Sequence, residues 1–364
     1  MRRRRYVAMV GSASLAGCLG RLGETDEAET DEKPPDEETT TERATVETDS
    51  GSFQRLWAAD LEDGDGGFTA NYQATADAET AYLGTPSHLI ALSLADGTEQ
   101  WTLSLDTPVN GVLIDDDGLF TLHERTVQRV DPVTGESRWT STGGIRSGAG
   151  DFYAATDDHV VASGEGGVRV FEKESGQQTA TLTSVLEPVR AWNGQFVVVD
   201  ASGLTAYDPD GTAQWTIDDV SVNWLSPVVG STVVGGGSGT FVGVDLEQGE
   251  QAWTTGADGS FRRPRTAGTD DTVFISPRSA GGFSALDPET GDVRWQNDDI
   301  YSASFSPVVL ESGLVFPETF GIQAIDLETG RQLAATDQRI DIQGVTGSGR
   351  TVVGYGDRAF AYRL

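Results

Sequence analysis

The stretch ALDPETGDVRW, residues 285–295, decides the fold of this chain. It has a small residue first, Asp two positions on, Gly at the seventh place and Trp at the eleventh. The same Gly-to-Trp spacing recurs along the chain and ends at five tryptophans: Gly97–Trp101, Gly135–Trp139, Gly211–Trp215, Gly249–Trp253 and Gly291–Trp295. Two weaker copies carry Ala180 and Ala334 in the Trp place, and successive Gly residues lie 35 to 42 positions apart. A period near forty with fixed Gly and Trp is typical of β-propeller blades.

Alternating Val-rich runs within each repeat predict four strands, which make one blade. Between Trp253 and Asp287 we expect strands near 253, near 267, at 272–276 and at 282–287. Prolines recur just before the second of these strands, where a missing N–H is tolerated. They are Pro108, Pro188, Pro227, Pro264 and Pro307.

The two ends of the repeat region predict the number of blades. Residues 53–58, with Trp57, resemble a Trp-bearing strand without its turn, and residues 358–363 resemble the strand that precedes such a turn. Together they complete one blade and remove an exposed edge. We therefore predict an all-β fold, an eight-bladed β-propeller of four-stranded antiparallel blades closed by pairing of the N- and C-terminal strands. A seven-bladed ring is the alternative.

The conserved spacing of Gly and Trp within the repeats indicates a structural role for the indoles. We expect each indole to lie on the peptide of the Gly turn four residues before it, because Gly has no side chain there. The other face of the ring then meets the small residue of the neighbouring blade. On this interpretation the six docking tryptophans include Trp57, and Ala180 and Ala334 mark weak seams between blades.

The N-terminus predicts export and anchoring rather than a folded domain. Residues 1–18 combine the pair Arg3 and Arg4 with a short apolar run, and resemble a twin-arginine signal that ends in a lipobox at Cys18. An ordinary cleaved signal peptide with a chance cysteine is the alternative. Residues 19–52, rich in Glu, Asp and Thr, predict a disordered tether that could carry O-linked sugars. Residues 53–364 are the predicted propeller domain.

The charge of the chain indicates its surroundings. The formal net charge is −32, and Lys and Arg together number 25 against 57 acidic residues. Because concentrated salt screens such self-repulsion, we interpret the chain as halophilic and of haloarchaeal origin. An ordinary acidic secreted domain is the alternative. Nucleic-acid binding is disfavoured, since phosphate contacts need a basic face.

The repeat resembles the quinoprotein-type propeller repeat, with Ala, Gly and Trp at its first, seventh and eleventh places. The copies that begin at Ala91 and Ala285 match it fully, and the one that begins at Gly243 has Gly in first place. Across residues 53–364 this resemblance implies one of two classes. One is the pyrroloquinoline-quinone alcohol dehydrogenases, which typically carry a Cys–Cys disulfide, a metal ion and a catalytic Asp. The other is the BamB-like lipoproteins, which are non-enzymatic scaffolds for outer-membrane protein assembly.

The chain fits the scaffold class better, because Cys18 is its single cysteine and it is much shorter than those dehydrogenases. An archaeal cell has no outer membrane, so the BamB task does not carry over directly. We predict a monomeric lipoprotein at the cell surface, anchored to the outer face of the cytoplasmic membrane, that binds exported or membrane proteins. We expect no catalytic residue, no metal and no cofactor. A dehydrogenase using pyrroloquinoline quinone is the alternative function.

Loops that lead into the Pro-bearing strands predict a binding patch at one mouth of the channel. The mixture of Arg and aromatic residues is typical of interaction sites, and we expect an acidic or aromatic partner. Neutralisation of nearby Asp side chains is the alternative role of these arginines. The predicted members are Arg146, Arg190, Trp224, Arg262, Arg263, Arg265 and Tyr301, with Phe261 and Phe305 nearby.

Other motifs have plainer interpretations. The Gly235–Gly239 run lacks the Lys and the helix of a phosphate loop, and predicts a hairpin turn. Asp115–Gly118 and Asp270–Asp271 lack calcium-loop spacing, so we interpret them as solvated turns, with Ca²⁺ binding as the alternative. The three histidines, His88, His123 and His159, lie at unrelated places in the repeat and are expected to be structural.

Overall fold

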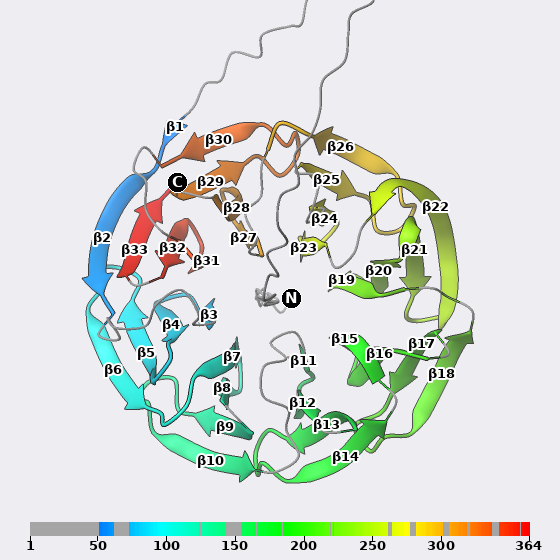
Figure 1. The fold of residues 1–364 in the computed structure, drawn as a ribbon, viewed down its shortest axis with the longest axis horizontal. Coiled ribbons are helices and arrows are strands. Elements are labelled where there is room, and N and C mark those ends of the chain that lie inside the picture. Colours follow the sequence, from blue (N-terminus) through cyan, green and yellow to red (C-terminus); the bar gives the residue numbers. More distant parts are fainter. Residues whose placement is uncertain are drawn as a thin grey trace, which may run out of the picture.

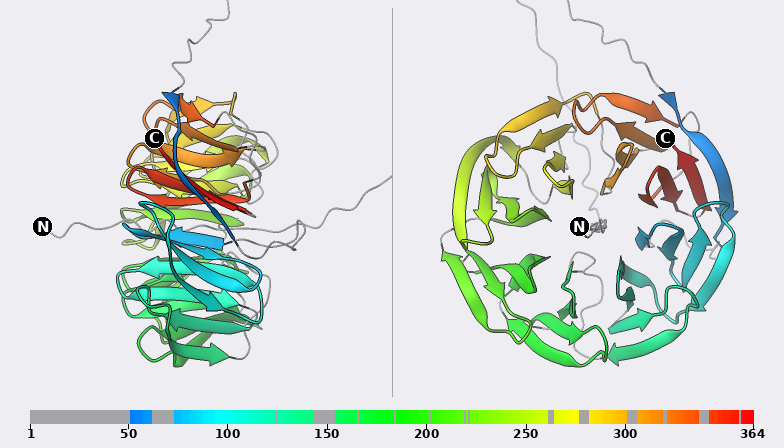
Figure 2. Two further views of the ribbon diagram at one scale, coloured as in Figure 1. Left: turned by 90° about the vertical axis from the view of Figure 1, so that its left-hand side faces the viewer. Right: turned by 180° about the vertical axis from the view of Figure 1, so that it is seen from behind.

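The computed structural model describes residues 51–364 except 62–72, 124, 143–153, 165, 184, 202, 219, 221, 261–263, 277–281, 301–305, 319–320, 337–341 and 357. The strands form eight sheets arranged as the blades of a closed ring (Figure 1). From the side the ring is a thick disc that the strands cross (Figure 2). The predicted eight-bladed, all-β propeller is confirmed. Nothing in the described part of the chain is a helix long and apolar enough to span a bilayer.

Each blade is an antiparallel sheet whose strands run in order from the centre of the ring to its rim. Blade 1 contains β3 (Gln73–Ala76), β4 (Thr80–Gly84), β5 (His88–Ser93) and β6 (Glu99–Ser104), and blade 2 contains β7 (Val109–Asp115), β8 (Gly118–His123), β9 (Thr126–Val130) and β10 (Ser137–Thr142). Blade 3 contains β11 (Ala154–Ala155), β12 (His159–Gly164), β13 (Gly167–Glu172) and β14 (Gln178–Thr183). Blade 4 contains β15 (Val185–Trp192), β16 (Gln195–Asp200), β17 (Gly203–Tyr207) and β18 (Ala213–Asp218).

The second four blades repeat this order, and blade 8 takes its outermost strand from the N-terminal side of the chain. Blade 5 contains β19 (Trp224–Val229), β20 (Thr232–Gly236), β21 (Ser238–Asp245) and β22 (Glu250–Ser260), and blade 6 contains β23 (Arg265–Gly268), β24 (Val273–Ser276), β25 (Phe283–Leu286) and β26 (Val293–Asn297). Blade 7 contains β27 (Val308–Leu310), β28 (Gly313–Glu318), β29 (Gly321–Ile325) and β30 (Gln332–Ala335). Blade 8 contains β31 (Gly344–Ser348), β32 (Thr351–Tyr355), β33 (Arg358–Arg363) and β2 (Gln54–Asp60).

The ring closes where the two ends of the domain pair. Strand β2 lies antiparallel to β33, with Trp57 opposite Ala361. An ion pair of 2.5 Å between Arg358 and Asp60 ties one end of this pairing. The predicted closure is therefore confirmed. A further strand, β1 (Gly51–Ser52), runs parallel to β30 as a fifth strand of blade 7, although its residues fall in the segment expected to be a tether.

The sequence repeat and the structural blade do not begin at the same strand, so one repeat spans two blades. The repeat that begins at Trp253 takes β22 from blade 5 and β23 to β25 from blade 6, because the chain crosses from the rim of one blade to the centre of the next. The recurring prolines mark the innermost strands. Pro108, Pro264 and Pro307 directly precede β7, β23 and β27, whereas Pro188 and Pro227 lie inside β15 and β19, at shifts of register.

The core lies between the blades. Val197 and Leu204 of blade 4 pack with Val233 and Val244 of blade 5 in a single buried cluster. Other clusters join neighbouring blades around the ring in the same way. Each blade therefore buries the faces of its neighbours, and the stability of a seam depends on the side chains at it.

Candidate functional site

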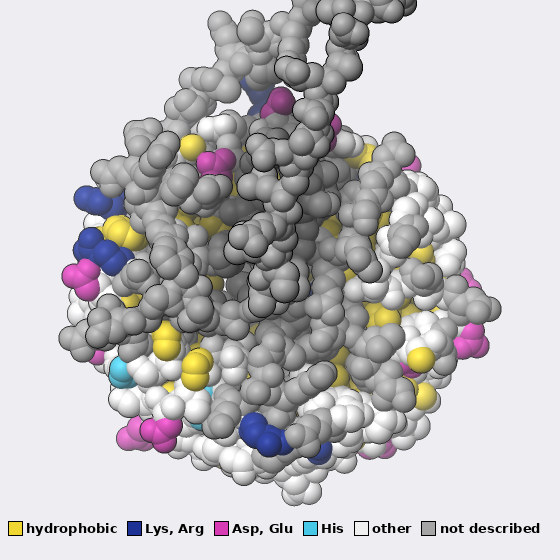
Figure 3. All heavy atoms as spheres, in the orientation of Figure 1, with side chains coloured by type: hydrophobic (Ala, Val, Ile, Leu, Met, Phe, Trp, Pro, Cys, Tyr) yellow, Lys and Arg dark blue, Asp and Glu magenta, His cyan; other side chains and the backbone are white. Residues whose placement is uncertain are grey.

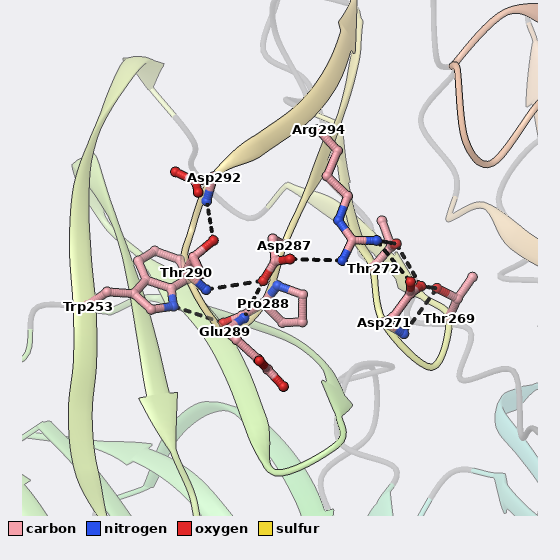
Figure 4. Close-up of polar contacts among 10 residues, drawn as sticks. All are labelled: Trp253, Thr269, Asp271, Thr272, Asp287, Pro288, Glu289, Thr290, Asp292 and Arg294. Carbon is pink, nitrogen blue, oxygen red and sulfur yellow. Dashed lines mark hydrogen bonds and ion pairs between the residues drawn. The ribbon is translucent and has the colours of Figure 1, made fainter.

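At most seams of the ring, a tryptophan of one blade packs on a glycine turn of the next blade. The indole of Trp253, on the rim strand of blade 5, lies over Gly291 of blade 6, and Figure 4 shows its bond to the same turn at Pro288. A Cβ added to Gly291 would lie 2.6 Å from Cε3 of that ring, and φ of Gly291 is +78°, so the turn requires glycine. Nε1 of Trp253 donates a hydrogen bond of 2.8 Å to the carbonyl oxygen of Pro288, in the same turn.

The same geometry recurs at four other seams. In each, the indole N–H donates to the carbonyl three residues before the Gly of the next blade. These bonds run from Trp57 to Leu94 (3.0 Å), Trp101 to Pro132 (2.9 Å), Trp139 to Lys173 (2.7 Å) and Trp295 to Leu327 (2.9 Å). Trp215 covers Gly249 of blade 5.

The indole makes both expected kinds of contact, but the blades that supply them are the reverse of those we expected. Each ring meets the Gly turn of the next blade, not the turn four residues before it. Its small neighbour belongs to its own blade, since Trp101 is paired with Ala91 and Trp253 with Gly243. Paired residues on adjacent strands project from the same face of a sheet. The indole therefore stands on its own small neighbour and reaches the following blade.

The two seams without tryptophan have other contacts. At Ala180, the hydroxyl of Thr179 donates a 3.0 Å hydrogen bond to the carbonyl of Pro209, in the turn of Gly211. Ala180 itself lies against Gly211. At Ala334, strand β1 pairs alongside β30, and Ala334 is buried. A short polar contact and an added strand thus replace the indole at the two seams.

The Asp of the repeat stabilises the docking turn. Oδ1 of Asp287 accepts hydrogen bonds from the backbone N–H groups of Glu289 (2.9 Å) and Thr290 (3.2 Å). Its Oδ2 accepts from Arg294, which also binds Asp271 at 3.0 Å (Figure 4). The Arg294 hydrogen bond is the main reason that the pKa of Asp287 is lowered. Asp271 is therefore engaged within the blade.

The turn of blade 2 offers a direct test of this electrostatic arrangement. Arg138 binds Asp131, and this hydrogen bond, with those from the Thr134 and Val133 N–H groups, lowers the pKa of Asp131 to about 2. We expect Arg138→Gln to raise that pKa towards the usual value near 4. A depressed carboxyl pKa stabilises the fold above the unfolded value, and this stabilisation is lost as the pH falls through the folded pKa.

The stability difference between wild-type and Arg138→Gln proteins should therefore be full above about pH 4 and should shrink as the pH falls from about 4 to 2, the range in which Asp131 is protonated to different extents in the two proteins. Carboxyl chemical shifts of Asp131 measured against pH check this directly. Arg169→Gln, which removes a guanidinium of β13 hydrogen-bonded to Gln178, is the control. An Asp131 midpoint unchanged by Arg138→Gln would contradict the assignment.

A buried cation joins blades 2 and 3. Lys173, one of two lysines in the chain, has a side chain 6% exposed. Its Nζ lies 2.5 Å from Asp115 and 3.2 Å from Asp117. Nη1 of Arg129 donates to the Lys173 carbonyl at 3.0 Å. Asp115 and Asp117 are thus not simply solvated turn residues, because both form an ion pair with one lysine of the next blade.

The predicted channel-mouth patch is only partly described, and its described members hold blades together. Arg190 donates to the carbonyls of Val189 (2.8 Å), Leu225 (2.5 Å) and Ser226 (2.6 Å), across the seam of blades 4 and 5. Trp224 is 4% exposed and meets the Phe241 ring edge-on, with centroids 5.6 Å apart.

Arg265 is also buried, opposite Ser276 on β24. Trp224 and Arg265 are therefore buried rather than on the surface on which we expected them. Arg146, Arg262, Arg263 and Tyr301, with Phe261 and Phe305, lie outside the described residues.

Within the described ranges, the histidines bond to neighbouring polar side chains, and possible metal ligands do not form a cluster. Nδ1 of His88 lies 2.8 Å from the Ser87 hydroxyl, and His123 lies between Thr107 and Gln128. No three His, Cys, Asp or Glu side chains among the residues placed in the structure are grouped to hold a metal ion.

From the sequence, Lys173 and Thr179 were missed, and Arg190 was assigned to a binding patch instead of to the seam between blades 4 and 5. The signal for Lys173 was available, since it is the single lysine of residues 53–364 in a strongly acidic chain. Arg190 and Thr179 carried no such signal, because their partners lie 36 and 30 residues away.

The geometry defines an eight-bladed propeller whose blades are joined by tryptophan docked on glycine turns. A family model described as outer membrane protein assembly factor BamB matches residues 43–203 and 200–362, and the chain belongs to this family of PQQ-type propellers.

Two solved structures share the fold. The chain is 16% identical to the computationally designed Ika8 protein, with a TM-score of 0.65, covering 85% of this chain and all of that one. It is also 16% identical to BamB from Moraxella catarrhalis, with a TM-score of 0.51, covering 81% of this chain and 85% of that one. No curated protein matches the chain.

Proposed function

We propose that this protein is a lipid-anchored surface module that binds exported or membrane proteins without catalysing a reaction. Membership of the BamB family across nearly the whole chain carries the proposal. The matching family model is described as an outer membrane protein assembly factor, and BamB from Moraxella catarrhalis has the same fold. Both support a protein-binding role for this chain. A rigid ring of eight docked blades offers a large fixed surface, as interaction modules require.

The anchor follows from the N-terminal sequence. Arg3 and Arg4 begin a twin-arginine signal, and Cys18 is the residue to be lipidated. An acyl chain contributes about 0.8 kcal/mol per buried CH₂ to membrane binding. The segment between Cys18 and strand β1 then holds the propeller away from the outer face of the cytoplasmic membrane. The acidic composition supports a working environment of concentrated salt, where charge repulsion is screened.

The experiment compares native protein with Cys18→Ser, both expressed with the complete N-terminus in a high-salt host. We expect mass spectrometry to find lipid on Cys18, and the membrane fraction to retain the wild type but not the variant. Exported proteins are expected to co-purify with the anchored form in multimolar salt. A wild-type N-terminus that begins downstream of Cys18 without lipid would contradict the anchor.

The patch is tested in the same preparation with Arg262→Ser/Arg263→Ser. Its matched control, Arg331→Ser/Arg350→Ser, makes the same charge change at exposed positions of the ring. We expect the first variant to lose co-purifying proteins and the control to keep them. Equal retention by both variants would remove the patch from the proposed function.

A further inference from the structure

The outermost strands of the blades differ in how their free edges are protected. An exposed strand edge pairs readily with another chain, and charged side chains are a common defence. Among the eight outermost strands, six contain a docking tryptophan together with charge. These are β2 with Arg55, β6 with Glu99, β10 with Arg138, β18 with Asp218, β22 with Glu250 and β26 with Arg294.

The other two, β14 and β30, share two departures from this rule. Each carries Ala in the Trp place, Ala180 in β14 and Ala334 in β30, and neither contains a charged residue. The edge of β30 is occupied, since β1 pairs with it in parallel and places Gly51 opposite Ala334. A Trp-less, uncharged edge in this protein therefore already accepts an added strand.

Strand β14 presents the same kind of edge without such cover in the described part of the chain. Its inner side pairs with β13, with Ala180 opposite Val170 and Thr183 opposite Gly167. Gln178, Thr179 and Thr183 are exposed. Thr residues at alternate positions also favour strand pairing. The backbone of β14 is thus ready to extend the sheet of blade 3.

The position of β14 in the ring separates it from the point where the N-terminal chain joins the propeller. Blade 3 lies four blades from blade 7, on the opposite side of the ring (Figure 1). The N-terminal chain joins the propeller at blade 7 through β1. The free edge of β14 therefore lies at the rim farthest from the point where the tether enters. In the face drawn in Figure 3, acidic side chains lie at several places around the rim, and Lys or Arg side chains lie at the left and at the lower side.

We propose that the outer edge of β14 binds an extended segment of another protein as an added parallel strand. Main-chain hydrogen bonds give affinity in this mode of recognition, and side-chain pairs give selectivity. The segment is uncharged or basic, because the propeller is strongly acidic, and it has a small residue opposite Ala180, as Gly51 lies opposite Ala334. A second copy of this chain is the competing occupant, and the test below distinguishes it from a segment of another protein.

This inference rests on the proposed binding function but uses a surface separate from the channel-mouth patch. The probe is an end-blocked, fluorescently labelled dodecapeptide of alternating Thr and Ser, with a central Ala and one Arg at each end. Fluorescence anisotropy in multimolar KCl measures binding. Amide hydrogen exchange locates the site, and we expect the probe to protect residues 178–183.

Thr181→Lys and Thr181→Glu are each expected to weaken binding at least tenfold, because a charge of either sign obstructs the edge. Thr140→Lys and Thr140→Glu are the matched controls, since Thr140 follows Trp139 in β10 as Thr181 follows Ala180 in β14. These controls should leave affinity unchanged. Thr183→Lys, at an exposed position of β14, repeats the test if the Thr181 variants do not fold.

Three results would overturn the proposal. One is unaltered exchange in residues 178–183 with the probe bound. Another is opposite effects of Lys and Glu at position 181, which would indicate simple charge attraction. The third is a wild-type dimer in sedimentation equilibrium that Thr181→Lys dissociates, which would make a second copy the occupant. None of them bears on lipidation of Cys18 or on co-purification through the patch, so the two proposals fail separately.

Discussion

Trp253→Ala is expected to lower the free energy of unfolding by about 3 kcal/mol, the low end of the range for large-to-Ala changes at buried sites, because the indole is partly buried. The indole fills the space between Gly243 of its own blade and Gly291 of the next. Neither glycine has a side chain that can move into the gap. The change also leaves the carbonyl of Pro288 without its 2.8 Å hydrogen bond. Denaturant unfolding at fixed high salt measures the loss.

Trp253→Phe separates the two contributions. It keeps a ring over Gly291 but removes the N–H donor, so we expect a loss of about 1 kcal/mol, the typical net value of one hydrogen bond, plus a smaller packing loss. An unfolding midpoint unchanged by Trp253→Ala would contradict the docking role. A result in which Phe and Ala cost the same would assign the effect to the hydrogen bond and not to packing.

Lys173→Ala is expected to lower the free energy of unfolding by about 3–5 kcal/mol, because removing one partner of a buried ion pair leaves the charge of the other partner uncompensated. The side chain of Asp115 is 13% exposed and loses a cation 2.5 Å away. The carbonyl of Lys173 accepts from both Trp139 and Arg129, so the backbone at this position is held independently. The loss should therefore arise from the side chain.

Two comparisons test this explanation. Asp117→Asn is expected to cost less than about 1 kcal/mol, since Asp117 is half-exposed and such pairs contribute little. The double variant Lys173→Met/Asp115→Asn should recover much of the stability lost in Lys173→Ala, because no unpaired charge remains. Thermal unfolding at several salt concentrations measures all three. Equal losses for the single and double variants would rule out charge burial as the cause.

Much of the architecture was readable because its signals are local and repeated. The Gly and Trp of residues 285–295 mark a turn and a rim strand, and their recurrence predicts one blade per repeat. The half-repeats around Trp57 and at residues 358–363 predicted the closing blade, and β2 does pair with β33. Matched prolines located the innermost strands. Each signal lies within about ten residues of the structure it specifies.

The site was less readable because its contacts cross between blades. The spacing of Gly and Trp places both in one phrase, yet the indole rests on the glycine of the following phrase. Arg190 and Trp224 have the composition of a binding surface, but their surroundings bury or engage them. Lys173 and Asp115 are 58 positions apart, and nothing in either segment alone indicates a pair.

The strands, the turns between them and the eight repeats follow from the sequence, since backbone propensity and turn chemistry act over short distances, and the two half-repeats at the ends indicate how the ring closes. The tertiary structure alone decided which face meets which: the partner of each indole, the cation between blades 2 and 3, and the strand added beside Ala334. These depend on how neighbouring sheets stack, and that is a property of the assembled ring rather than of any one repeat.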